Sequence, residues 1–164
     1  MLALATQDDA ALRVSTAELD APERPYTVET IARLRTERAG AGARLFFVMG
    51  ADSWAEITTW REWERLLGMC DHVVVTRPGY EIETGHVNEE ARARAVDLRG
   101  ADAGRARRAL ADDDGPKIFF SDAVKLEISS TDVRRAARQG VGRPPVPRRV
   151  ADYLEKYGLY TEAT

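Results

Sequence analysis

The sequence contains a single cysteine, Cys70, and only two histidines, His72 and His86. One cysteine cannot form a disulfide within the chain and cannot build a cysteine-based zinc site. Neither His-x-x-x-His nor Cys-x-x-Cys occurs, so the histidines lack the spacing of a metal-binding motif. These absences exclude a disulfide scaffold and a zinc module, and they favour a reducing, cytoplasmic location.

Long apolar runs are also absent, since no stretch approaches the roughly 18 residues that a membrane-spanning helix needs. Residues 1–5 are apolar but lack the basic segment of a signal peptide. Neither sign of charge dominates, because 24 basic and 27 acidic side chains give a net charge of −3. The sequence therefore predicts no membrane partner and no nucleic-acid partner held by phosphate attraction, and it leaves the oligomeric state open.

Two common catalytic loops are missing as well. The sequence has no Gly-x-x-x-x-Gly-Lys-[Ser/Thr] motif, which excludes a P-loop nucleotide hydrolase. It also has no Gly-x-Ser-x-Gly motif, which argues against a serine hydrolase.

Three short segments have an apolar centre, at residues 45–49, 72–76 and 117–121. Runs of this length without alternation are typical of strands buried on both faces of a parallel sheet. Residues 12–19 alternate between apolar and polar side chains, which predicts a further short strand. Helical patterns follow the strands, so we predict an α/β fold with a mostly parallel sheet.

The predicted domain organisation is a single domain over residues 1–164 with a variable insertion at about 83–115. This insertion is rich in Ala, Arg, Asp, Glu and Gly, and its arginines are interspersed with acidic residues. Such a composition favours a surface helix or a loose insertion outside the core.

The residues that follow the predicted strands are the first candidates for a site, because ligands bind at the carboxyl ends of parallel strands. Gly50 permits a close approach of the backbone, and Asp52 could accept hydrogen bonds from ribose hydroxyls. The alternative for Asp52 is a helix N-cap.

Residues 129–134, Ser-Ser-Thr-Asp-Val-Arg, give the sharpest local signal. A helix that begins here offers backbone N–H groups, three hydroxyls and the Arg134 guanidinium, which together could hold a phosphate. The alternative is a serine N-cap completed by Asp132 as a capping box, with Arg134 on the surface.

Two aromatic–polar pairs are the remaining candidates, Tyr26-Thr27 and Trp60-Arg61. Thr27 is predicted as the N-cap of a helix that begins at Val28. Trp60 is predicted to begin a helix, from which its ring could stack on a flat ligand. The alternative for Trp60 is core packing.

In this order, the segments resemble the bacterial nicotinate-nucleotide adenylyltransferases, which have a Rossmann-like nucleotidyltransferase fold. The resemblance covers nearly the whole chain except the insertion. Among the adenylyltransferases, the Tyr-Thr pair together with Gly-x-Asp and the tryptophan indicates the members that act on nicotinate mononucleotide. The matching segments are residues 25–30, 47–53, 59–63, 75–80, 128–134 and 146–160.

The resemblance implies roles for these residues. The substrates would be ATP and nicotinate mononucleotide, and Mg²⁺ would be bound with ATP, giving deamido-NAD in NAD biosynthesis. The acceptor would be bound by Tyr26, Thr27, Trp60 and Arg61, and ATP by Gly50, Asp52, Ile128, Ser129, Ser130, Thr131 and Arg134.

The sequence departs from the family at its beginning. The family's Gly-Gly-Thr-Phe-Asp-Pro and His-x-Gly-His motifs supply the central strand and the catalytic histidines, and neither occurs here. We therefore identify no catalytic residue, and we expect the first strands to be missing and the chain as written not to turn over. A misplaced start, a fragment or a true truncation would each give this pattern. The alternatives are a non-catalytic nucleotide-binding remnant and an adenylyltransferase for another phosphorylated acceptor.

Overall fold

The computed structural model describes all residues except 22, 39–41, 77–81, 125–128, 140–143 and 161–164. The chain divides into two compact units, of which the larger is Ala17–Leu126 and the smaller combines Met1–Thr16 with Glu127–Thr164. None of the described helices is long and apolar enough to cross a membrane.

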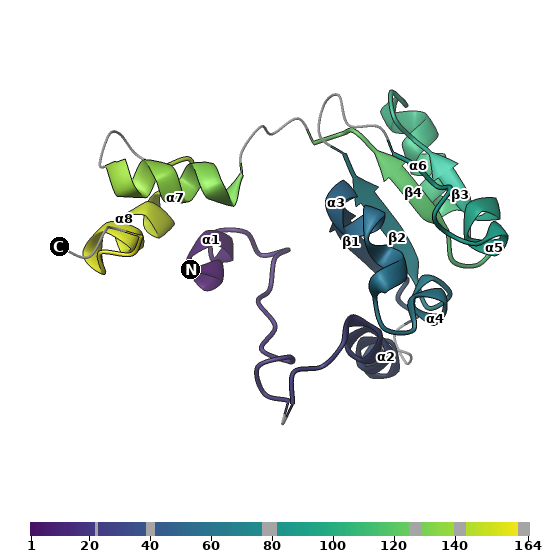
Figure 1. Ribbon diagram of the computed structural model, residues 1–164, viewed down its shortest axis with the longest axis horizontal. Helices are drawn as coiled ribbons and strands as arrows, with labels where there is room; N and C mark the ends of the chain where they lie inside the picture. Colours follow the sequence, from purple (N-terminus) through teal and green to yellow (C-terminus); the bar gives the residue numbers. More distant parts are fainter. Residues whose placement is uncertain (22, 39–41, 77–81, 125–128, 140–143, 161–164) are drawn as a thin grey trace. The chain divides into compact units, whose positions relative to one another are not determined.

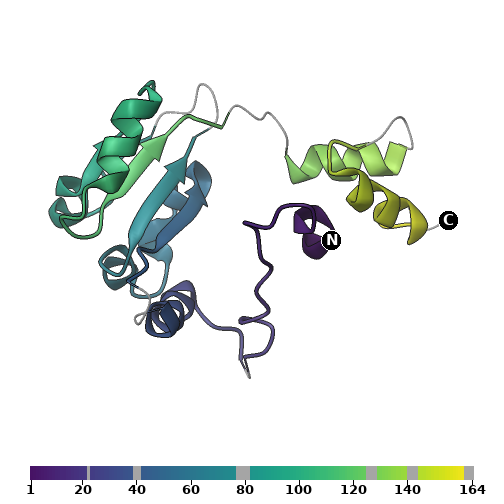
Figure 2. The same cartoon turned by 180° about the vertical axis from the view of Figure 1, so that it is seen from behind.

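The larger unit is built on a four-stranded sheet in the order β1-β2-β4-β3, and every neighbouring pair is parallel. The predicted parallel α/β architecture is therefore confirmed. Figure 1 shows α3 in front of β1, whereas Figure 2, seen from behind, shows α6 in front of β3 and β4. The elements of this unit are α2 (Thr27–Arg38), β1 (Phe46–Gly50), α3 (Ala51–Ala55), η2 (Ile57–Thr59), α4 (Trp63–Leu67), β2 (Asp71–Val75), α5 (Glu89–Ala93), β3 (Ala95–Asp97), α6 (Ala103–Ala111) and β4 (Ile118–Ser121).

The three apolar runs form β1, β2 and β4, as predicted, but β1 is not buried on both faces. It is an outer strand of the sheet, and Val48 is 62% exposed while Met49 is buried against the helices. An apolar run gives the tendency to form a strand but does not reveal the position of that strand in the sheet. The position of β1 in the sheet depends on which strands it pairs with, and the sequence of the strand itself does not show this.

Two further expectations were wrong. Residues 12–19 form no strand, and Leu12, Val14 and Leu19 are all exposed, since these residues pair with no strand in the described part of the chain. Within residues 83–115, β3 pairs with β4, and Val87, Ala91 and Leu98 are buried. This segment therefore contributes to the core, because a few well-placed apolar residues suffice to cover a sheet despite a polar composition.

The described residues of the smaller unit form three helices. Its last helix, α8, buries Val150, Ala151 and Leu154 and contacts α1. Helix α8 begins just after Pro147 and is followed by Gly158 with a positive φ of 56°. The helices are α1 (Leu2–Thr6), α7 (Ser130–Gln139) and α8 (Arg148–Lys156).

A partly buried ion pair holds the amino ends of the strands together. Arg44, just before β1, binds Asp71 at the start of β2 through Nε–Oδ2 at 2.5 Å and Nη2–Oδ1 at 2.9 Å. The same Asp71 carboxylate accepts the backbone N–H of Lys117, next to β4, at 2.9 Å. Arg44 also donates to the carbonyl of Leu110 in α6. Four elements therefore meet at one charge pair.

His72 follows Asp71 in β2 and is also buried. Its side chain is fully buried, Nδ1 lies 3.0 Å from the Cys70 carbonyl, and the Phe47 ring packs edge-on at 5.8 Å between centroids. Desolvation lowers the pKa of His72 to about 4, because the charged imidazolium would lose its hydration. His72 is therefore a neutral core residue.

Replacement of Arg44 by Ala should lower the free energy of unfolding by about 2–3 kcal/mol, because it leaves the Asp71 carboxylate buried without its cation. The value lies below that of a fully buried pair, since the Arg44 side chain is 23% exposed. Urea denaturation measures the change. The control is Arg65→Ala, which removes an exposed pair with Glu62 and should cost no more than about 0.5 kcal/mol. Equal losses in the two variants would contradict the structural role of Arg44.

Stability should also fall as the pH drops from about 6.5 toward 4, because the unfolded state protonates His72 in this range and the folded state does not. Through this group alone, the free energy of unfolding should be about 2 kcal/mol lower at pH 5 than at pH 7. Urea denaturation at the two pH values measures it. His72→Phe keeps the apolar packing and should remove this part of the slope; an unchanged slope would show that other groups cause it.

Candidate functional site

Gly50 and Asp52 lie at the carboxyl edge of the sheet. Gly50 is the last residue of β1 and pairs with Val75, the last residue of β2. A Cβ at Gly50 would meet no atom within 4 Å, so the space beside this backbone is open. The predicted N-cap role of Asp52 is wrong, because Gly50 itself occupies the cap position of α3. Asp52 lies in the first turn with its side chain exposed, where the carboxylate can meet a ligand.

The four residues predicted to bind the acceptor line one cavity of about 550 Å³. This brings together two segments that lie more than thirty residues apart in the sequence. The Arg61 guanidinium lies over the Tyr26 ring, 4.7 Å from its centroid, and the Trp60 ring packs edge-on against Phe47 of β1 at 6.3 Å. The lining residues are Arg24, Pro25, Tyr26, Thr27, Thr59, Trp60 and Arg61.

The local structure around this cavity differs from the prediction. Trp60 does not begin a helix but has extended backbone, since α4 begins only at Trp63 after Glu62 in the left-handed conformation. Thr27 is already helical, and Tyr26 precedes the helix with its backbone N–H bonded to the Glu29 carboxylate at 2.9 Å. The extended backbone of Trp60 leaves its ring partly buried, so one edge packs on the core while the residue still lines the cavity.

Sequence reasoning missed Arg24 at this cavity. Its side chain is exposed and lines the cavity with Arg61, so two guanidinium groups accompany one indole ring. A site of this kind suits a flat, negatively charged molecule, because the indole offers a stacking face and arginine pairs with carboxylates and phosphates. The one available signal was the position of Arg24 next to the Pro-Tyr-Thr segment.

In the smaller unit, residues 129–134 form the start of α7 as a capping box. The Ser129 backbone N–H and hydroxyl both bond to Asp132 Oδ2, at 3.1 and 2.5 Å, and the Asp132 N–H bonds back to the Ser129 hydroxyl at 3.1 Å. Ser130 and Thr131 are exposed, and Arg134 donates to the Thr131 hydroxyl at 3.3 Å. The capping alternative is therefore realised at Ser129, and it leaves the Thr131 and Arg134 side chains at the surface. Ile128 lies outside the described residues, as do Arg77–Gly79.

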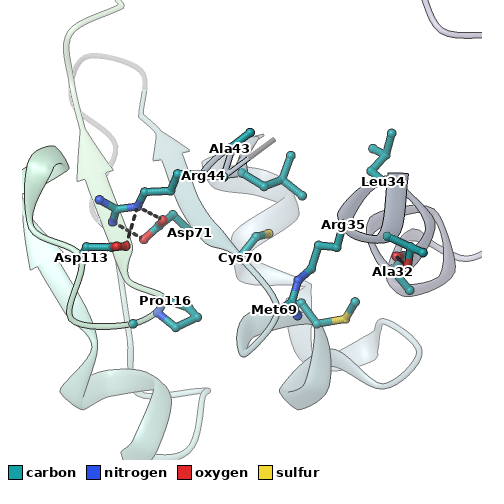
Figure 3. A pocket seen from close by; sticks show the side chains of 14 residues that line it. Ala32, Leu34, Arg35, Ala43, Arg44, Met69, Cys70, Asp71, Asp113 and Pro116 are labelled. Carbon is teal, nitrogen blue, oxygen red and sulfur yellow. Dashed lines mark hydrogen bonds and ion pairs between the residues drawn. The ribbon is translucent and has the colours of Figure 1, made fainter. Parts of the chain in front are cut away.

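A larger cavity, of about 640 Å³, lies at the opposite edge of the sheet (Figure 3). It contains the Arg44–Asp71 pair, and Arg35 of α2 extends toward Met69 in it. None of the predicted site residues that the structure describes lines this cavity. Its position at the amino ends of the strands separates it from the edge at which parallel sheets bind ligands.

Comparisons with known sequences identify the relatives of this chain. The family model described as cytidylyltransferase-like matches residues 1–136. A protein named "Probable nicotinate-nucleotide adenylyltransferase" from Corynebacterium jeikeium is 34% identical over 166 residues, covering 99% of this chain and 73% of the relative. A protein of the same name from Thermus thermophilus is 36% identical over 161 residues, covering 98% of this chain and 70% of the relative.

A comparison with solved structures gives the fold. The Plasmodium falciparum nicotinic acid mononucleotide adenylyltransferase, complexed with APC, matches with a TM-score of 0.54 and 18% identity. The match covers 85% of this chain and 60% of that chain. At this identity the likeness shows the fold alone, and it confirms the Rossmann-like α/β class predicted from the sequence.

Proposed function

Because the chain belongs to the nicotinate-nucleotide adenylyltransferases of the cytidylyltransferase-like family, we propose that it makes deamido-NAD from ATP and nicotinate mononucleotide. The reaction joins the adenylyl group of ATP to the phosphate of the mononucleotide and releases pyrophosphate. It places the protein in NAD biosynthesis, and a cytoplasmic location is part of the same proposal.

One observation carries the proposal beyond the family. A single cavity is lined by the four residues that the sequence predicts to bind the acceptor, and they come from two separate segments: Tyr26, Thr27, Trp60 and Arg61. That cavity combines an indole ring with the guanidinium groups of Arg24 and Arg61. Nicotinate mononucleotide has a flat aromatic ring, a carboxylate and a phosphate, which are the groups such a cavity suits.

In this proposal Trp60 stacks on the pyridine ring and Arg61 leaves the Tyr26 ring to meet an anionic group. A cation–π contact at an exposed site is worth about 0.5–1 kcal/mol, less than a hydrogen bond between charged groups, so the exchange is favourable. Tyr26 and Thr27 close the side of the cavity formed by the start of α2.

For ATP we propose the binding residues that the family resemblance implies. Gly50 gives the adenosine room beside the strand end, and the exposed Asp52 carboxylate accepts the ribose hydroxyls. The phosphates would meet Thr131 and Arg134 on α7, where the positive end of the helix dipole adds to the arginine charge. Ile128, Ser129 and Ser130 would complete this group of ATP-binding residues.

We propose that Mg²⁺ enters with ATP. Among the described residues, no group of three or more His, Cys, Asp or Glu side chains is placed to hold a metal ion. The exposed hydroxyls and arginine of α7 suit phosphates and not a cation, so the phosphate oxygens themselves would be the ligands. When bound, Mg²⁺ would neutralise phosphate charge while the acceptor phosphate attacks the α-phosphorus and pyrophosphate leaves.

The experiment that tests the function is a turnover assay with ATP and nicotinate mononucleotide, with detection of both deamido-NAD and pyrophosphate. Formation of both products would confirm adenylyl transfer and would contradict the expectation that the chain as written does not turn over. Binding of both substrates without product would favour the non-catalytic alternative. Faster turnover with a different acceptor than with nicotinate mononucleotide would favour an adenylyltransferase for another phosphorylated acceptor.

Trp60→Ala should weaken binding of nicotinate mononucleotide by roughly 0.5–1.5 kcal/mol beyond the loss of buried area, because it removes the stacking face. The affinity for ATP should change little. Isothermal titration calorimetry with each ligand measures both. The control is Tyr157→Ala, which removes an exposed aromatic ring outside the cavity. A folded Trp60→Ala protein with unchanged mononucleotide affinity would show that Trp60 only packs on Phe47.

Arg134→Ala should lower the affinity for ATP by about ten- to a hundredfold, because a hydrogen bond between charged groups contributes about 1.5–3 kcal/mol. Calorimetric titration with ATP and Mg²⁺ is the measurement. Arg148→Ala, on the exposed face of α8, is the matched control and should bind ATP normally. A change of only a few tenths of a kcal/mol would leave Arg134 as a solvated helix residue.

A further inference from the structure

The surface of α7 beyond its first turn carries a second feature. A cavity of about 300 Å³ is lined there by Thr131, Arg134, Arg135, Arg138 and Gln139. Three of these five residues are arginines, and two of them, Arg135 and Arg138, belong to none of the segments assigned a role above. The cavity lies wholly on one described helix of ten residues.

Helical spacing explains why these side chains converge. Thr131, Arg134 and Arg138 are three and four residues apart, so they lie above one another on one face of α7. Arg134 and Arg138 are four residues apart, or ~6 Å along the helix axis. Both side chains line the same cavity as Thr131.

The charges on this face are not balanced within the helix. Asp132 is the single acidic residue of α7, and its Oδ2 accepts two hydrogen bonds from Ser129 in the capping box. Its Oδ1 lies 3.2 Å from Arg135. Arg134 donates to the neutral Thr131 hydroxyl. Among the residues that the structure describes, neither Arg134 nor Arg138 forms an ion pair.

We propose that Arg138 acts with Arg134 to bind a diphosphate group, so that each of the two arginines meets one of the linked phosphates. Two arginines that line one cavity favour a diphosphate over a single phosphate, because each guanidinium can bind two oxygens and the linked phosphates offer both arginines a partner. This inference rests on the proposed function, in which the diphosphate is either the terminal part of ATP or the pyrophosphate product.

The test is calorimetric titration of the full chain with three probes, pyrophosphate, ATP and AMP, in the presence of Mg²⁺. Arg138→Ala should weaken pyrophosphate and ATP binding by about tenfold, because an exposed charge-assisted contact lies at the lower end of its range. AMP has no diphosphate, so its affinity should stay within about twofold of the original. Arg138→Lys keeps the charge without the planar fork and should give a smaller loss.

The matched control is Arg107→Ala, which removes an exposed arginine of α6 and should leave all three affinities unchanged. Loss for pyrophosphate but not ATP would assign the site to the released product, and loss for both would assign it to ATP as well; either result supports a diphosphate site. Unchanged pyrophosphate binding in Arg138→Ala, or an equal loss for AMP, would overturn the inference.

Titration with nicotinate mononucleotide separates this inference from the proposed function. If the original protein binds the mononucleotide but not pyrophosphate, the diphosphate site is wrong and the acceptor assignment stands. If it binds pyrophosphate through Arg138 but not the mononucleotide, the diphosphate site stands and the proposed acceptor is wrong.

Discussion

The ion pair between Arg44 and Asp71 is the interaction on which the geometry of the sheet depends. Asp71 is 3% exposed, and its two oxygens accept from the Arg44 guanidinium and from the backbone of Lys117. A buried carboxylate without partners would cost several kcal/mol, so the folded state needs all three groups in place. The pair thereby fixes the amino ends of β1, β2 and β4 at one level, and through the Leu110 carbonyl it also fixes the end of α6.

This constraint has a consequence at the other edge. Because the strands are parallel and start in register, Gly50, Val75 and Ser121 also end at one level. At this edge, side chains such as Asp52 stay exposed. At the amino edge, the charges of Arg44 and Asp71 are paired and largely buried, and they stabilise the fold. At the carboxyl edge, where parallel sheets bind ligands, the Asp52 carboxylate is exposed to solvent.

Helix α7 also combines a charged side chain that is bound within the protein, Asp132, with arginines that have no carboxylate partner on the helix. Asp132 is needed by the cap, since it satisfies the Ser129 N–H and hydroxyl. That use leaves the arginines at positions 134 and 138 with no carboxylate of their own on the helix. The capping box at Ser129 therefore uses Asp132 and leaves Arg134 free of that carboxylate, so it does not exclude the proposed binding of an anion by Arg134.

The sequence by itself determined the three main strands and the parallel α/β class, because runs of apolar residues are local features. Its short motifs also singled out Tyr26, Thr27, Trp60 and Arg61, which line one cavity. It did not determine that β1 is an outer strand or that β3 joins the sheet, since strand pairing depends on residues far away in the chain. It also missed Arg24 and mistook the backbone at Trp60, where the left-handed Glu62 separates the indole from α4. Only the tertiary structure decided these points, because the energy that selects them comes from pairing, burial and charge contacts between distant segments.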